Sequence, residues 1–139
     1  MNESHPAMTA ARASWKCVQA GDKQGWLDLM AEDICIEDPI GIAATNPTGD
    51  GVRGKQTVSE FWDKNMASAR ISVETHESRT AGMESAHVLT LTVRFDNGVT
   101  SRVHGIFAYM VNDEGKLTNL RGWWVMDDMS FEQPKGDPH

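Results

Sequence analysis

The sequence predicts an α+β fold, in which three N-terminal helices wrap a cone-shaped, curved sheet of mixed and antiparallel strands. Apolar residues recur at helical spacing in three segments of the first half, and after Ala69 they alternate with a period of two. A short strand-like segment at residues 34–37 interrupts the helical half. A curved sheet covered by helices encloses a conical cavity, and a cone of this size holds one small apolar ligand.

The first helix is predicted over residues 7–20, where Trp15 lies on the apolar face and Gly21 provides a C-terminal stop. Asp22 is a natural N-cap, so a short second helix is expected at 22–30. A third helix, at 55–67, carries an apolar stripe in which we assign Phe61 and Met66 to the core. Before it, residues 41–53 form a long loop rich in Gly, Pro, Asn and Thr, which either covers a site as a lid or is simply mobile.

Four strands are predicted in the second half, at 71–75, 86–95, 99–111 and 117–131. The sequence Asp-Asn-Gly between the second and third of these is a strong hairpin signal. The last strand is apolar on both faces. In a chain this small, that pattern indicates that helices cover one face and a second copy of the chain covers the other. We therefore expect a homodimer formed through the sheet face.

Length and composition favour one domain over residues 1–139, with a core at about 8–131. The net charge of −7 and the scattered basic residues argue against nucleic-acid binding. No apolar run is long enough for a membrane span. Cys17 and Cys35 are predicted to be buried free thiols, which fits a cytoplasmic location. No metal ligand set or cofactor motif is present, so we expect neither.

Asp38 is the most informative residue. It ends the strand-like segment and precedes Pro39, which restricts the backbone and so fixes the direction of the carboxylate. A carboxylate beside an apolar core is costly unless it is paired, hydrogen-bonded or nearly neutral. The residues alone leave two interpretations open: an acidic strand end that faces water, or a carboxylate that faces a pocket.

The stretch Ala20-Gly21-Asp22, followed by Leu29 to Asp33 and by Glu37-Asp38-Pro39-Ile40-Gly41, resembles the delta-5-3-ketosteroid isomerases, especially the actinobacterial type. These belong to the nuclear transport factor 2-like superfamily. The likeness covers about residues 8–130. It implies a steroid or similar apolar small molecule as the ligand, with Asp38 as the general base that moves a proton from carbon 4 to carbon 6 of a 3-oxo-Δ5-steroid.

The sequence departs from this family at the oxyanion hole. Ser14 stands where the family has a tyrosine, and Phe107 stands where it has a protonated aspartate. Tyr109, two residues further along the same strand face, is the candidate substitute donor, and Ser14 is a weaker one. The resemblance also implies four residues that line the ligand pocket: Trp15, Trp62, Phe107 and Trp124.

Three functions follow as alternatives. The first is an isomerase-like enzyme, the second is a non-catalytic carrier or sensor of steroid-like ligands that has lost the oxyanion hole, and the third is a structural or protein-interaction domain. The related epoxide hydrolases are disfavoured, because His104 and Gly122 stand where their aspartates are needed. We interpret His76 and His87 as ordinary surface or sheet residues.

Overall fold

The structure, a computed structural model, describes residues 4–134. The ends of the predicted domain, residues 1–3 and 135–139, lie outside the described residues. The helices are α1 (Pro6–Ala20), α2 (Lys23–Asp28), α3 (Lys55–Asn65) and the 3-10 turn η1 (Met126–Asp128). The strands are β1 (Met30–Glu37), β2 (Val52–Arg53), β3 (Arg70–Ala81), β4 (Glu84–Arg94), β5 (Thr100–Val111), β6 (Leu117–Trp123) and β7 (Met129–Glu132).

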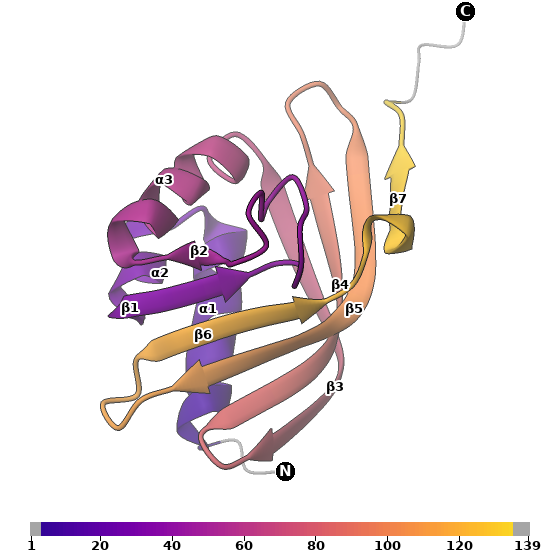
Figure 1. Ribbon diagram of the computed structural model, residues 1–139. Coiled ribbons are helices and arrows are strands. Elements are labelled where there is room, and N and C mark those ends of the chain that lie inside the picture. Colours follow the sequence, from indigo (N-terminus) through magenta and orange to yellow (C-terminus); the bar gives the residue numbers. More distant parts are fainter. Residues whose placement is uncertain (1–3, 135–139) are drawn as a thin grey trace, which may run out of the picture.

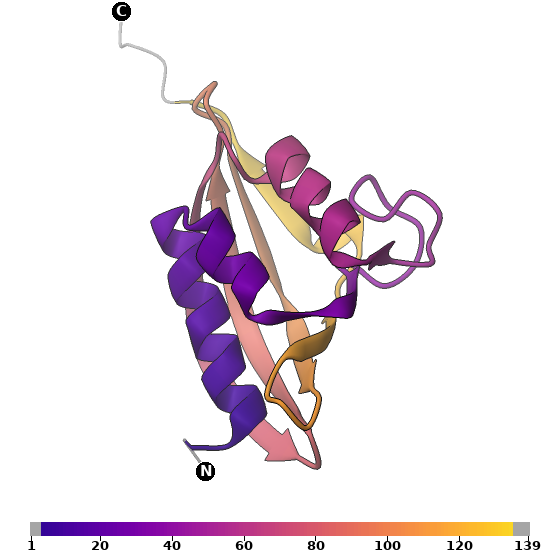
Figure 2. The same cartoon turned by 90° about the vertical axis from the view of Figure 1, so that its left-hand side faces the viewer.

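These strands form one curved sheet in the order β2-β1-β6-β5-β4-β3, with β7 beside β5 (Figure 1). β1 runs parallel to β6, and the other neighbouring pairs are antiparallel. Seen from the side, α1, α2 and α3 all lie nearer to the viewer than the long strands (Figure 2). The predicted α+β fold, with three helices and a mixed curved sheet, is confirmed.

The ends of the first two helices follow from local chemistry. Gly21 has φ +70°, a left-handed conformation that favours glycine, and its N–H bonds to carbonyl groups of the last turn of α1. The Asp22 carboxylate then accepts the Gly25 N–H at 2.9 Å and so caps α2. Both predictions for this helix break are confirmed. The break turns the chain directly into β1.

The core lies between α1 and the concave face of the sheet, because α1 packs against β3, β4 and β5. Alternation along β5 separates the two faces. Val103, Phe107 and Tyr109 point inward and are buried, whereas His104 and Ile106 lie on the opposite face and are exposed. Within the described residues, none of the helices has the length and apolar character needed to cross a membrane.

The prediction of one continuous strand over 117–131 is wrong. β6 ends at Trp123, and the chain turns through η1 before β7 pairs with the start of β5. The turn is held by the Asp128 carboxylate, which accepts the Val125 N–H at 2.8 Å. The apolar pattern hides this break, because Trp124 and Met126 both still face the inside of the cone.

Candidate functional site

A cavity of about 330 Å³ lies between the helices and the concave face of the sheet. That volume is within the range of small-molecule sites. Most of its lining is aliphatic or aromatic. The polar side chains that reach it are few: Ser14, Asp38, Thr45, Asn65, Ser101 and Tyr109. Such a cavity binds an apolar body and can orient it through a small number of hydrogen bonds.

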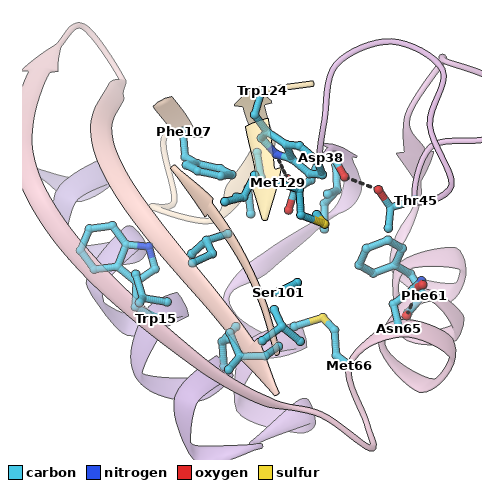
Figure 3. Close-up of a pocket in the computed structure, with 18 of the residues that line it drawn as sticks. Trp15, Asp38, Thr45, Phe61, Asn65, Met66, Ser101, Phe107, Trp124 and Met129 are labelled. Atoms are coloured by element: carbon cyan, nitrogen blue, oxygen red, sulfur yellow. Dashed lines mark hydrogen bonds between the residues drawn. The ribbon is translucent and has the colours of Figure 1, made fainter. Parts of the chain in front are cut away.

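Asp38 follows β1 and turns its carboxylate into this cavity (Figure 3). Its Oδ1 accepts a hydrogen bond of 2.7 Å from the indole N–H of Trp124. Oδ2 has no hydrogen-bond partner among residues 4–134. Burial raises the pKa of the Asp38 carboxyl above its ordinary value, and the Trp124 hydrogen bond offsets part of this rise. Of the two interpretations that the sequence left open, the structure therefore favours the pocket-facing carboxylate.

The space for this carboxylate depends on Gly122 in β6. A Cβ atom at this position would lie 2.9 Å from Oδ1 of Asp38 and 2.9 Å from the Phe107 ring. It would also lie 3.0 Å from the Trp124 indole nitrogen. Because real Cβ atoms do not approach other atoms so closely, a side chain here would displace the carboxylate or its partners. Glycine is thus what lets Asp38, Phe107 and Trp124 meet at one point.

The loop after Asp38 is tied to the same corner by Asn46, which is 1% exposed. Its side-chain N–H donates to the Pro39 carbonyl at 3.0 Å, and its side-chain oxygen accepts the Gly51 N–H at 2.9 Å. Thr45, next to it, donates to the backbone carbonyl of Asp38 and lines the cavity. The Asp38–Pro39 peptide is cis. A buried asparagine with both ends bonded makes this loop a fixed wall of the cavity.

Tyr109 is the second polar group on the inward face. It is 4% exposed, and its hydroxyl oxygen accepts the Trp15 indole N–H at 2.9 Å. No acceptor for the hydroxyl proton is found among the described residues, so that proton remains available to a ligand. Burial raises the pKa of Tyr109 above its usual value, the Trp15 hydrogen bond opposes this, and the charge of Asp38 adds to the rise. The group is therefore a neutral hydrogen-bond donor at physiological pH.

His87 lies behind this donor and is 1% exposed, although its sequence context predicted an ordinary surface or sheet residue. Its two ring nitrogens lie 2.6 and 2.7 Å from the hydroxyls of Ser78 and Ser85. Its ring meets Trp15 and Tyr109 edge-on, with centroids 4.8 and 5.6 Å away. Burial lowers the pKa of His87 to about 4, so the ring is neutral near pH 7. Its place on the same face of β4 as Leu89 was the signal for its burial.

Most of the other predicted site residues also lie at the cavity. Trp15, Phe107 and Trp124 line the cavity with Asp38 and Tyr109, and so does Ser14. Ser14 is buried, and its hydroxyl oxygen accepts the Trp26 indole N–H at 3.1 Å. Trp62 does not line the cavity. It packs in the core against Trp26, with ring centroids 5.1 Å apart.

Helix α3 presents different residues to the cavity from those expected. Phe61 and Met66, which the apolar stripe assigned to the core, both line the cavity. Residues 61 and 62 are successive on a helix and so differ by about 100° in direction, which is why Phe61 reaches the cavity and Trp62 does not. Ser101 was also missed, although it shares the inward face of β5 with Val103 and Tyr109. Strand alternation was the signal that could have found it.

A conical α+β fold with one carboxylate and one phenol inside an apolar cavity defines a class of small-molecule pocket proteins. The sequence profile of the SnoaL-like domain matches residues 11–120. The chain therefore belongs to the SnoaL-like family of nuclear transport factor 2-like proteins.

Solved structures place the chain near ketosteroid isomerase-like proteins within this family. It is 47% identical to the delta 5-3-ketosteroid isomerase from Mycobacterium sp., with a TM-score of 0.90 over 92% of this chain and 99% of the other. It is 48% identical to RV0760c from Mycobacterium tuberculosis in complex with estradiol-17beta-hemisuccinate, with a TM-score of 0.88 over 92% and 100%. A computationally designed 17-OHP binder is 45% identical, with a TM-score of 0.91 over 93% and 100%.

Proposed function

We propose that the chain binds a steroid or a similarly shaped apolar molecule and acts as a steroid delta-isomerase-like enzyme. The observation that carries this proposal is the geometry of Asp38 in an apolar cavity: Oδ1 is held by Trp124, while Oδ2 has no hydrogen-bond partner among residues 4–134. Relatives named as a ketosteroid isomerase, an estradiol-17beta-hemisuccinate complex and a 17-OHP binder support a steroid as the ligand.

The proposed reaction is a proton transfer within the substrate. The Asp38 carboxylate removes a proton from carbon 4 of a 3-oxo-Δ5-steroid, and the electron pair of that bond generates a dienolate with negative charge on the 3-oxygen. The same carboxyl then returns the proton to carbon 6, which leaves the double bond between carbons 4 and 5. The raised pKa of Asp38 suits it to take and return a proton at neutral pH.

Tyr109 is the proposed donor to the dienolate oxygen. The hydroxyl that accepts a hydrogen bond from Trp15 is thereby a stronger donor, since linked hydrogen bonds polarise one another. The edge contacts from His87 and Trp15 hold the Tyr109 ring in place. Ser14 stays a secondary donor, because its oxygen is occupied by Trp26 while its own proton has no acceptor among the described residues.

A direct test follows the conversion of androst-5-ene-3,17-dione to its conjugated isomer by ultraviolet absorbance. We expect turnover by the natural chain and its loss in Asp38→Asn, which keeps the size of the side chain and its bond to Trp124. Asp33→Asn, which changes an exposed carboxylate of β1, is the matched control and should keep full activity. If the natural chain shows no turnover, or if Asp38→Asn retains it, the proposed catalysis is overturned.

A second candidate is a non-catalytic binder of steroids or other small apolar ligands. Phe107 favours it, because a phenylalanine at this inward position cannot donate a hydrogen bond to an oxyanion. Titration with equilenin separates the two functions. Tight binding without turnover indicates the carrier, and no binding excludes both.

We further propose that the chain forms a homodimer through the convex face of the sheet and resides in the cytoplasm. Ile106, Met110 and Trp123 lie on that face, and they are 48%, 37% and 47% exposed in the single chain. Such residues are costly to leave in water and typical of an interface. Cys35 is a buried free thiol, as predicted, whereas Cys17 is free but only half-buried. Free thiols suit a reducing compartment.

A further inference from the structure

Ser101 in β5 is a buried residue whose hydroxyl is open to the cavity. The residue is 4% exposed and lines the cavity from the inward face of the strand. Among residues 4–134 no group forms a hydrogen bond with its Oγ. Other buried serines are all bonded: Ser14 accepts from Trp26, and Ser78 and Ser85 bond to His87. Ser101 is the exception among them, and it lines the cavity.

The side chains around Ser101 are apolar. Its cross-strand neighbours are Val93 in β4 and Phe131 in β7. Both neighbours line the cavity as well, and so does Val103 on the same strand face. Among the described residues no fully buried side-chain nitrogen or oxygen lacks a partner, so the unpartnered Ser101 oxygen is open to the cavity, where it can bond to water or to a ligand. A polar atom of a ligand would supply the missing partner.

Ser101 lies in a different part of the cavity from Asp38 (Figure 3). Phe107, whose ring is close to the Asp38 carboxylate around Gly122, is six residues further along β5. At roughly 3.3 Å per residue the two positions are at most about 20 Å apart, and the direct distance through the cavity is shorter because β5 is curved (Figure 1). Figure 3 shows Ser101 well separated from Asp38 and Trp124 within the pocket. A ligand that reaches both places must therefore be elongated.

We propose that Ser101 is a second polar anchor of the cavity, which binds an oxygen at the end of the ligand remote from Asp38. The inference rests on the proposed function, since it assumes that a ligand's reactive end lies at Asp38 and Tyr109. It narrows the ligand class to a rigid apolar skeleton with an oxygen function at each end. A steroid with a 3-oxo group and a 17-oxo or 17-hydroxyl group has this pattern.

The experiment compares two ligands on two proteins. Androst-4-ene-3,17-dione has oxygens at both ends, and androst-4-en-3-one has the same skeleton without the 17-oxygen. Their dissociation constants are measured by tryptophan fluorescence for the natural chain and for Ser101→Ala. A neutral hydrogen bond corresponds to about a 3- to 10-fold change in affinity. We expect the natural chain to prefer the dione by that factor and Ser101→Ala to lose the preference by binding the dione more weakly.

Ser85→Ala is the matched control, because Ser85 is also a buried serine but is bonded to His87 and does not line the cavity. We expect it to leave the ratio of the two affinities unchanged. Thermal unfolding separates the two serines a second time. Ser101→Ala should be at least as stable as the natural chain, since no hydrogen bond is lost, whereas Ser85→Ala should unfold at a lower temperature.

Equal affinities of the natural chain for the two steroids would overturn the role of Ser101 while leaving steroid binding intact. The same holds if Ser101→Ala keeps the preference for the dione, which would indicate that water alone meets the hydroxyl. A natural chain that binds neither steroid contradicts the proposed function itself and this inference with it.

Discussion

The indole N–H of Trp124 donates a 2.7 Å hydrogen bond to Oδ1 of Asp38, although 86 positions separate the two residues in the sequence. This bond does two things at once. It fixes the direction of the carboxylate, and it partly compensates the charged form for the loss of water. The pKa of the proposed base therefore depends on a residue close to the C-terminal end of the chain.

Replacing Trp124 by phenylalanine tests this relationship. Because the hydrogen bond lowers the pKa of Asp38, its removal should raise that pKa. The acid limb of the pH profile of kcat/KM should then move to higher pH. Trp123→Phe is the control, since Trp123 is 47% exposed on the other face and lies under Arg121, 5.3 Å from its guanidinium carbon. Equal changes of the pH profile in both variants would contradict the assignment.

Asp38→Asn should stabilise the fold at neutral pH. A carboxyl whose pKa is raised on folding favours the folded state fully below its unfolded pKa of about 3.9. That contribution is lost as pH rises through the folded pKa, and each tenfold change in the acid dissociation constant on folding corresponds to about 1.4 kcal/mol. Urea unfolding at pH 7.5 should show the variant to be more stable than the natural chain, and the gap should close towards pH 4. Asp33→Asn should show no such trend, and a variant less stable at pH 7.5 would refute the idea.

Tyr109→Phe removes the proposed donor to the dienolate while keeping the ring. If Tyr109 acts in this way, kcat for androst-5-ene-3,17-dione should fall by about 10²–10³-fold. Trp15→Phe leaves the hydroxyl in place and removes the indole N–H that bonds to it, while an aromatic ring still lines the cavity, so a fall of less than about 10-fold is expected. A Tyr109→Phe variant with natural kcat would transfer the role to Ser14 or remove it altogether.

Asn46→Ala should loosen the wall of the cavity next to Asp38. It leaves the buried Pro39 carbonyl and Gly51 N–H without partners, and each such loss costs about 1–3 kcal/mol. We expect a decrease of about 2–4 kcal/mol in the free energy of unfolding measured in urea. The exposed Asn97, which caps a turn by accepting the Val99 N–H, gives the control Asn97→Ala, with a cost below about 1 kcal/mol. Comparable losses would show that the loop is not held by Asn46.

Ile106→Lys should dissociate the proposed homodimer, because a charge at the centre of an apolar interface is costly to bury. Sedimentation should give a dimer for the natural chain and a monomer of about 15 kDa for the variant. Ile42→Lys is the control, because Ile42 is 80% exposed but lies in the loop after β1. A natural chain that sediments only as a monomer would disprove the dimer.

Much of the fold was predictable because hydrophobic periodicity and chain-breaking residues carry it. Gly21 and Asp22 placed the helix break, and alternation placed β4 and β5. The break between β6 and β7 was missed, because Trp124 and Met126 keep the apolar pattern of a strand while the backbone turns. The alternation of apolar residues indicates which side chains face the core, but it does not show where the backbone leaves the sheet.

The charged residue of the site was predictable from the sequence, whereas the residues that line the cavity were less so. Asp38 was found from an unusual carboxylate beside an apolar strand, and the family resemblance gave it a role. Trp62 and Phe61 exchanged their expected positions: successive helical residues point about 100° apart, and the apolar stripe does not show which of its edges faces the cavity. Ser101 was missed because a serine in a strand is unremarkable until its hydroxyl is seen to lack a partner.

The parallel pairing of β1 with β6 has a consequence for how the molecule is made. Residue 30 meets residue 117, and Glu37 meets Arg121, so the corner that holds Asp38 joins the early chain to its last quarter. Contacts between such distant segments are slow to form, because a long loop must close first. Leu120, Trp124 and Phe131 line the cavity, so a chain still emerging from the ribosome has no complete binding cavity until these residues have been made. Ligand binding in this cavity therefore requires that β6 and β7 have folded onto the rest of the chain.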